Sequence, residues 1–483
     1  MRDISVTVSR HDKYQVELKF ICPMQEEKKD GSYHFELFFF LPRNLAVSSE
    51  NYDSRDFYND FSEYIRFQTP QVSLEELASG EHNAFLRLKN SDPDNIDEYG
   101  KSLKMFCSIV KSALRDSSAV ISGMDEVSQL LATRKFLADG QSLLRNFRQL
   151  SPEGKKYPES SELFDLADEF ISLTVHRYIF RLWRTSGAAA DPRMHAEIAA
   201  VTGQEMEYRA KKNFLSLPQM DSDNSQLVYR ESALKKAMAG VLFLNVETRK
   251  AGVLLENILM GAGAAVAMIF VTAISFIWAG LLFDQFSLSF FVIWVIAYIF
   301  KDRIKAGMQN YFLRHRSRYS YDFQQKIRDG LGNDVGMCRE GFLYCSEAEL
   351  DKKIVKLRDR RTLSRLENAS LKDNVMVFRK RIELSGRGCS DIHREFDVNG
   401  VVDILRISTR HWTYKMDNPH RMVYISDGQK ISAVKANRDY HVNLIIRYGR
   451  KGGEDKFQRF RLILCRDGIR KLEKVTVPGF DQP

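Results

Sequence analysis

Residues 257–283 read "NILMGAGAAVAMIFVTAISFIWAGLLF", a run of 27 residues without a charged side chain in a chain whose charged content is 28%. As a helix this run would measure ~40 Å, more than the ~30 Å hydrocarbon core of a bilayer. A second uncharged run follows Asp284, residues 285–300, and its 16 residues would measure only ~24 Å as a helix. Together the two runs predict a central hairpin of two transmembrane helices.

The position of the turn decides whether both helices are long enough to cross. A turn at Ala279-Gly280 leaves residues 254–278 and 281–300 for the two spans. Asp284 then lies close to the far interface, where a charge is tolerated and the N-terminal end of a helix favours an anion. Two alternatives stay open, a re-entrant hairpin that returns to the same side and a hairpin buried in a soluble core. Adjacent uncharged runs of this length are rare in soluble cores, which favours the membrane.

Basic residues flank the hairpin and are missing from its turn. Arg249 and Lys250 precede the first run, whereas no Lys or Arg separates the two runs. By the positive-inside rule we expect a multi-pass protein of the cell inner (plasma) membrane with both termini in the cytoplasm. The cations after the second run are expected either to contact anionic lipid headgroups or to serve as a topology signal only. They are Lys301, Arg303, Lys305, Arg314, Arg316 and Arg318.

Small residues recur at four-residue spacing in the first run. Gly261 pairs with Ala265, and Gly263 with Ala267. Such pairs allow two helices to approach closely, either inside the hairpin or between protomers. Neither run contains Lys, Arg, His, Glu or Pro, so an ion or proton path through the hairpin has little support.

Composition suggests two or three domains with opposite charge. Of 72 Lys/Arg and 63 Asp/Glu, residues 301–483 hold 39 and 24, a net of +15, which leaves −6 for residues 1–300. The six cysteines are scattered without metal or redox spacing, which favours a reducing compartment. The first residues alternate like a strand and do not resemble a signal peptide.

The hydrophobic periods predict how the flanking parts fold. Residues 1–220 are expected to form an α+β domain, with a small three-stranded antiparallel sheet over residues 1–42 followed by helices. A connecting helix over 221–253 should lead into the membrane, and a basic juxtamembrane helix over 301–330 should lead out of it. Residues 331–483 predict a β-rich basic domain, with tight turns at Asp427-Gly428 and Asp467-Gly468.

No common catalytic motif is found in the chain. There is no phosphate-binding loop, HExxH, GxSxG or paired-cysteine spacing, so we expect neither a cofactor nor a metal. The weak candidate is "SGRGCSDIHREFD", residues 385–397, where His393, Glu395 and Asp397 would share one face of a strand. An exposed loop is the simpler interpretation of the same residues.

The leading hypothesis is a membrane-tethered cytoplasmic scaffold, sensor or assembly factor. It would bind membrane lipids and, in addition, a protein partner, a second copy of itself or a small ligand. Arginines alternate with aromatic residues near the C-terminus, but without an RNA-recognition motif we do not expect a nucleic-acid partner. The alternatives are a membrane-anchored enzyme with a metal or acid/base site near residues 389–397, and an oligomeric channel or transporter.

Overall fold

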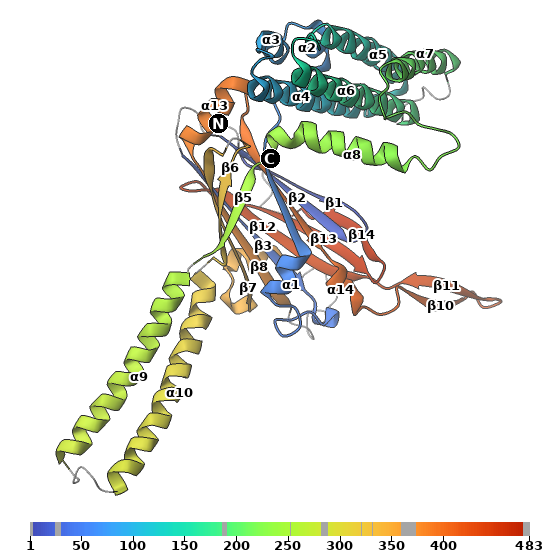
Figure 1. The fold of residues 1–483 in the computed structure, drawn as a ribbon. Coiled ribbons are helices and arrows are strands. Elements are labelled where there is room, and N and C mark those ends of the chain that lie inside the picture. The colour runs from blue at the N-terminus through green and yellow to red at the C-terminus, as the bar shows by residue number, and fades with distance from the viewer. Residues whose placement is uncertain are drawn as a thin grey trace.

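The computed structural model describes residues 3–24, 30–185, 191–251, 253–281, 288–319, 321–330, 332–358 and 373–476. Its body contains two antiparallel β-sheets with a bundle of α-helices on one side, and two long helices project from it (Figure 1). The expected mixture of helices and antiparallel sheets is therefore confirmed.

The smaller sheet has four strands in the order β1-β2-β9-β4, and the larger has eight in the order β14-β13-β12-β3-β8-β7-β6-β5. The strands of the smaller sheet are β1 (Ser5–Arg10), β2 (Gln15–Pro23), β9 (Gly400–Ser408) and β4 (Phe61–Phe67). Those of the larger are β14 (Gly468–Lys474), β13 (Lys456–Cys465), β12 (Tyr440–Arg450), β3 (Gly31–Leu41), β8 (Asn374–Leu384), β7 (Asp334–Cys345), β6 (Phe323–Arg328) and β5 (Asn245–Lys250).

Strands from the two ends of the chain are interleaved in both sheets. β3 lies between β8 and β12, and β2 pairs with β9. The three-stranded sheet expected over residues 1–42 is wrong, because β1 and β2 pair in one sheet while β3 belongs to the other. The two flanking parts share sheets and are not separate domains. Alternation of polar and apolar residues marks a strand and its buried face but does not name its neighbours.

The two sheets face each other, and apolar side chains fill the space between them. Phe20 of β2 stacks on Phe35 of β3 with ring centroids 4.0 Å apart. β3 is apolar on both faces. Its second face, which points away from the smaller sheet, is covered by helix α11 (Lys352–Arg358). The residues of that outer cluster are Phe38, Phe40, Val375, Val377, Ile445, Ile354 and Leu357.

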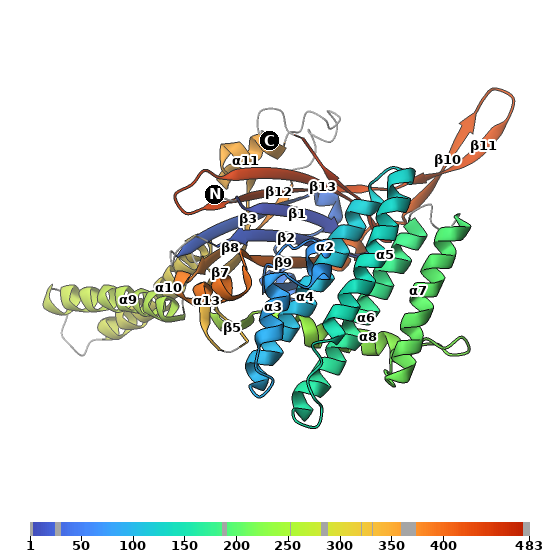
Figure 2. The same ribbon diagram turned by 90° about the horizontal axis from the view of Figure 1, so that it is seen from above.

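A bundle of helices covers one side of the body (Figures 1 and 2). The helices expected after residue 42 are present and include α5 (Glu126–Arg148) and α6 (Pro158–Thr185). Asp125 caps α5 by accepting a hydrogen bond from the backbone N–H of Ser128. The other helices of the bundle are α2 (Leu74–Ser79), α3 (Asn83–Asn90), α4 (Ile96–Ser122), α7 (Pro192–Lys211) and α8 (Ser225–Ala239).

The segments that flank the projecting helices are strands. The predicted connecting helix over 221–253 is wrong, since α8 ends at Ala239 and β5 follows it. The predicted helix over 301–330 ends early, at Tyr319, and β6 follows. β5 pairs with β6 up to Lys250 and Phe323, and the N–H of Ala251 donates to the carbonyl of Asp322 at 2.8 Å. Backbone pairing thus closes the base of the projection.

The projection consists of α9 (Val253–Leu281) and α10 (Leu288–Tyr319), which lie side by side and extend away from both sheets (Figures 1 and 2). We call this pair the arm. The turn predicted at Ala279-Gly280 is wrong, because α9 continues through both residues. Asp284, whose position motivated that prediction, lies outside the described residues.

The C-terminal strands contain the predicted tight turns. Gly428 (φ +90°) connects β10 (His420–Ser426) to β11 (Ile431–Asn437), and Gly468 (φ +121°) begins β14, both with the positive φ that favours glycine. The β10–β11 hairpin projects away from the arm (Figure 2). The remaining described elements are α1 (Ser54–Asp60), α13 (Gly386–Phe396), α14 (Arg410–Tyr414) and three short 3-10 turns at Arg43–Leu45, Gly240–Leu242 and Glu347–Glu349.

Candidate functional site

The arm presents large apolar side chains to its surroundings. Ile269, Phe276 and Phe291 are 68%, 76% and 65% exposed. α9 contains an 18-residue window, Asn257–Ile274, with a mean hydropathy of 2.0, of which only 17% is buried. By length and composition it is the one helix among the described residues that could cross a membrane. Its low burial distinguishes it from the core helix of a soluble protein.

α10 is apolar over only part of its length. Thirteen uncharged residues, Leu288 to Phe300, precede Lys301. The side chain of Lys301 is 18% exposed, and its Nζ lies 3.6 Å from the centroid of the Tyr298 ring. Arg303 and Lys305 are exposed, as headgroup contact requires. Arg314, Arg316 and Arg318 belong to the last turns of α10, and their side chains lie outside the described set.

The small residues of α9 divide into two faces. A Cβ added at Gly263 would lie 3.4 Å from the Cβ of Met308, and Ala267 is 1% exposed, so this pair faces α10. A Cβ added at Gly261 would meet nothing within 4 Å, and Ala265 is exposed. The first pair therefore packs the arm's own helices together, and the second faces away from α10.

A second unusual feature lies between the two sheets, where charged side chains are buried. The Nζ of Lys380, on β8, donates a hydrogen bond to Glu63 of β4 and lies 2.9 Å from Oε1 of Glu340 on β7. Oδ2 of Asp403, on β9, lies 2.8 Å from the same nitrogen as an ion pair without hydrogen-bond geometry. The side chains of Lys380 and Asp403 are fully buried, and Gln325 of β6 donates to Glu63. We call Lys380, Glu63, Glu340 and Asp403 the lysine cluster.

One ammonium cannot neutralise three buried carboxylates, so the cluster holds protons. Burial raises the pKa of Glu340 to about 8 and that of Asp403 to about 6, against the opposing effect of Lys380. Burial also disfavours the charged form of Glu63, but the ammonium of Lys380 and hydrogen bonds outweigh it and lower the pKa of Glu63 to about 2. At neutral pH the cluster keeps Lys380 and Glu63 charged and Glu340 protonated.

The lysine cluster was not predicted from the sequence, although a signal for it was present. Each member occupies an inward position of its strand, where apolar residues stand on either side at two-residue spacing. Asp403 lies between Val401 and Leu405, and Lys380 lies between Phe378 and Ile382. A charged residue in phase with the apolar face of a strand is the pattern that identifies a buried ion pair.

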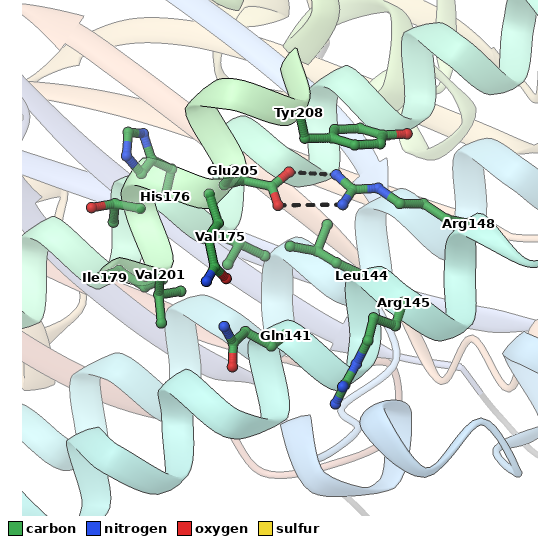
Figure 3. Close-up of a pocket in the computed structure, with 12 residues that line it drawn as sticks. Gln141, Leu144, Arg145, Arg148, Val175, His176, Ile179, Val201, Glu205 and Tyr208 are labelled. Atoms are coloured by element: carbon green, nitrogen blue, oxygen red, sulfur yellow. Dashed lines mark hydrogen bonds and ion pairs between the residues drawn. The ribbon is translucent and has the colours of Figure 1, made fainter. Parts of the chain in front are cut away.

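A cavity of about 260 Å³ opens in the helical bundle between α5, α6 and α7 (Figure 3). Arg148 ion-pairs with Glu205 and donates to Oδ1 of the buried Asp168 at 3.0 Å, while the hydroxyl of Tyr208 donates to Oδ2 of Asp168 at 2.6 Å. The apolar part of the wall is formed by Leu144, Val175, Ile179 and Val201. The other eight lining residues are polar or charged, so the cavity suits a small polar molecule.

His176 lines this cavity, and its protonation state and tautomer follow from its neighbours. Burial and the nearby guanidinium of Arg209 lower the pKa of His176 to about 4, so the ring is neutral at physiological pH. The Nη2 of Arg209 lies 3.1 Å from Nδ1 of His176. Because a guanidinium only donates, Nδ1 is the acceptor and the proton resides on Nε2.

The site predicted at residues 385–397 is wrong in its geometry. The segment forms helix α13, so His393, Glu395 and Asp397 do not share the face of a strand. Glu395 pairs with Lys101 at 2.7 Å, Nδ1 of His393 lies 2.9 Å from the carbonyl of Val398, and Asp397 adopts a left-handed conformation that ends the helix. Within the described residues, no group of His, Cys, Asp and Glu is arranged to hold a metal.

Comparisons of the chain with protein-family models, curated proteins and solved structures found no match.

Proposed function

We propose that this chain is a membrane-tethered scaffold, sensor or assembly factor, which the α9–α10 arm attaches to a lipid bilayer. The observation that carries the proposal is the exposure of large apolar side chains along a projecting helical pair, such as Phe276 and Phe291. In water so much contiguous apolar surface is unfavourable, and a bilayer relieves it. The inner membrane of a cell, with both termini in the cytoplasm, is the location that the flanking charges favour.

The topology of the body supports placement of both termini on one side. Residues before α9 and after α10 contribute neighbouring strands to the same sheets, as β3 does between β8 and β12. A membrane cannot separate strands that share backbone hydrogen bonds. The arm therefore enters and leaves the bilayer from the side on which the body lies, in agreement with the positive-inside rule.

The body offers binding surfaces that are remote from the arm. The cavity in the helical bundle suits a small polar ligand, with Arg148, Glu205 and Tyr208 among its polar lining residues. The β10–β11 hairpin, which projects away from the arm (Figure 2), carries Tyr424 and Ile431, whose side chains are 73% and 72% exposed. A ligand-binding bundle and exposed apolar strands on a tethered body are what a sensor or scaffold needs.

Excision of the arm tests the attachment directly. Because β5 and β6 pair up to its base, where Ala251 lies opposite Asp322, residues 252–321 can be replaced by Asn-Gly, a dipeptide that closes tight hairpins. The full chain should float with lipid vesicles in a density gradient and resist extraction by salt. The excised variant should remain at the bottom and unfold within a few degrees of the full chain.

Equal flotation of the two proteins would overturn the tether, as would a full chain that does not float. Equal unfolding temperatures serve as the control that the body of the excised variant is intact. The binding role has its own test, which is copurification in mild detergent. Purification without a protein partner, an oligomer, a bound lipid or a bound small molecule would contradict it.

A further inference from the structure

The register between α9 and α10 shows how far the arm can enter a bilayer. Gly263 lies opposite Met308 and Gln309, since a Cβ added to this glycine would lie 3.4 and 3.5 Å from their side chains. Gly263 is 18 residues from the end of α9, and Met308 is 20 residues from the start of α10, so the register agrees with a short connection between antiparallel helices. Val271 (8%) and Ala297 (4%) are also buried, nearer the end of the arm.

This register places charges beside the apolar window of α9. In antiparallel helices with equal rise, a step toward the arm's end in α9 matches an equal step in α10. Lys301 therefore lies at the level of Phe270, and Lys305 at the level of Val266. Both levels lie inside the window Asn257–Ile274. A bilayer that covered the whole window would also cover the segment 301–305.

Burial of that segment in hydrocarbon is unfavourable. Lys301, Asp302, Arg303 and Lys305 would all be in the membrane, and a charged residue at the centre of a span costs about 2.5–3.5 kcal/mol. The weak ion pair between Lys301 and Asp302, with 3.9 Å between Nζ and Oδ1, offsets little of this cost. Full crossing by both helices, the expectation from hydropathy, conflicts with the register.

We infer that the arm enters one face of the bilayer as far as residues 301–305 and does not cross it. The inserted part, which we call the tip, consists of residues 271–281 and 288–300. Its length is set by the 13 helical residues before Lys301, ~20 Å, against ~30 Å for the hydrocarbon core. The remaining part, which we call the stalk, consists of residues 253–270 and 301–319 and stands outside the hydrocarbon.

The residues at the boundary suit a bilayer with anionic headgroups. Lys301, Arg303 and Lys305 lie within about two turns, where each cation near such a surface contributes ~1 kcal/mol. Tyr298, which stacks under Lys301, is a residue type that favours the membrane interface. The stalk of α10, residues 301–319, is ~28 Å long and would hold the body that far from the surface.

This inference rests on the proposed membrane attachment, and cysteine labelling separates the two. Three single variants report on three levels: Asn310→Cys in the stalk, Val295→Cys in the tip and Leu288→Cys at the start of α10. Each full-length protein is added to preformed vesicles of phosphatidylcholine and phosphatidylglycerol in a three-to-one ratio. It is then treated with a membrane-impermeant maleimide, either outside or trapped inside. The unmodified chain, whose cysteines are mostly buried, is the background control.

Partial insertion predicts a specific pattern in vesicles that float. Asn310→Cys should label from outside as fast as in detergent, whereas Val295→Cys and Leu288→Cys should label at least about tenfold more slowly from either side. Protection of Asn310→Cys, or labelling of Leu288→Cys by trapped reagent, would overturn the inference and establish a full crossing. If the vesicles float without protein, the attachment itself is refuted, which is a different failure.

Discussion

The arm and the space between the sheets both invert the usual distribution of polarity, in opposite senses. Along the arm, apolar side chains such as Phe276 and Phe291 are exposed, whereas between the sheets Lys380 and Asp403 are fully buried. The buried charges are partly neutralised by ion pairs of 2.8–2.9 Å with Lys380 and by the proton on Glu340. The exposed apolar side chains lack a comparable covering within the described body, so they need a surface from outside the chain. The fold itself supplies the partners of the buried charges, whereas the apolar side chains of the arm need a partner from outside the chain.

The largest expected effect comes from removal of the cation in the lysine cluster. Lys380→Met would leave Glu63, Glu340 and Asp403 buried together without a counter-ion, and loss of one partner of a buried ion pair costs about 3–5 kcal/mol. We expect a corresponding fall in the free energy of unfolding, measured by urea denaturation of the detergent-solubilised protein. Membrane flotation of the folded fraction should not change, because the cluster and the arm are independent.

Lys471→Met is the matched control, since the side chain of Lys471 is 66% exposed beside Glu473. Its free energy of unfolding should change by no more than about 0.5 kcal/mol. If the two substitutions had equal effects, the buried cluster would not contribute more than a surface ion pair.

The next effect concerns the arm and distinguishes tip from stalk. Val295→Lys places a charge in the tip, where it should weaken partition into vesicles by about 2.5–3.5 kcal/mol, roughly 100-fold. Asn310→Lys places the same charge in the stalk and should not weaken partition. Sedimentation with vesicles measures both. Equal losses for the two variants would mean that the whole arm is immersed, and no loss for either would mean that the tip is not inserted.

Hydropathy, together with the alternation of polar and apolar residues, predicted many of the helices and strands from the sequence. The arm followed from the uncharged runs, and the strands and their turns followed from alternation and from Asp427-Gly428 and Asp467-Gly468. These are local properties, which neighbouring residues determine. The pairing of β3 with β8 and β12 is not local, because strands hundreds of residues apart in sequence must meet, and nothing within β3 specifies them.

The candidate sites were harder to predict for the same reason. His393 and Glu395 lie close in sequence and resembled a site, yet α13 directs them to separate partners. Glu63 is 317 residues from Lys380 in sequence, and Asp403 lies on the other sheet from Lys380, so the three meet only because two sheets face each other. The insertion depth of the arm was likewise hidden, because composition describes each helix alone and only the contact of Gly263 with Met308 aligns them.

A smaller effect concerns the proton on Glu340, which makes the stability of the fold depend on pH. Because the pKa of Glu340 is raised to about 8, the folded chain retains a proton that the unfolded chain has released. Stability should therefore fall as pH rises from about 4.5 to about 8, by up to ~1.4 kcal/mol per pH unit, and by roughly 2 kcal/mol over the window from pH 6.5 to 8. The raised pKa of Asp403, about 6, affects stability mainly below this window.

Glu340→Gln should remove most of this slope, because the amide keeps the shape of the protonated carboxyl and does not titrate. Glu383→Gln is the control, since Glu383 lies on β8 with a side chain 37% exposed, and it should keep the slope. Thermal unfolding across the pH range measures both. A slope that survives in Glu340→Gln would assign the proton to another group.

The smallest effect tests the register from which the insertion depth follows. Gly263→Leu would force side-chain atoms into Met308 and Gln309, and overpacking of this kind costs about 1 kcal/mol or more. Gly261→Leu adds the same side chain where nothing lies within 4 Å and should instead stabilise α9 by about 0.5–1 kcal/mol through helix propensity. The readout is the rate of disulfide formation between cysteines placed at Ala267 and Ile304, which this register puts at the same level. Gly263→Leu should slow that rate several-fold and Gly261→Leu should not. If the two cysteines do not react even in the otherwise unmodified chain, the register is wrong, and the ~20 Å limit on insertion is wrong with it.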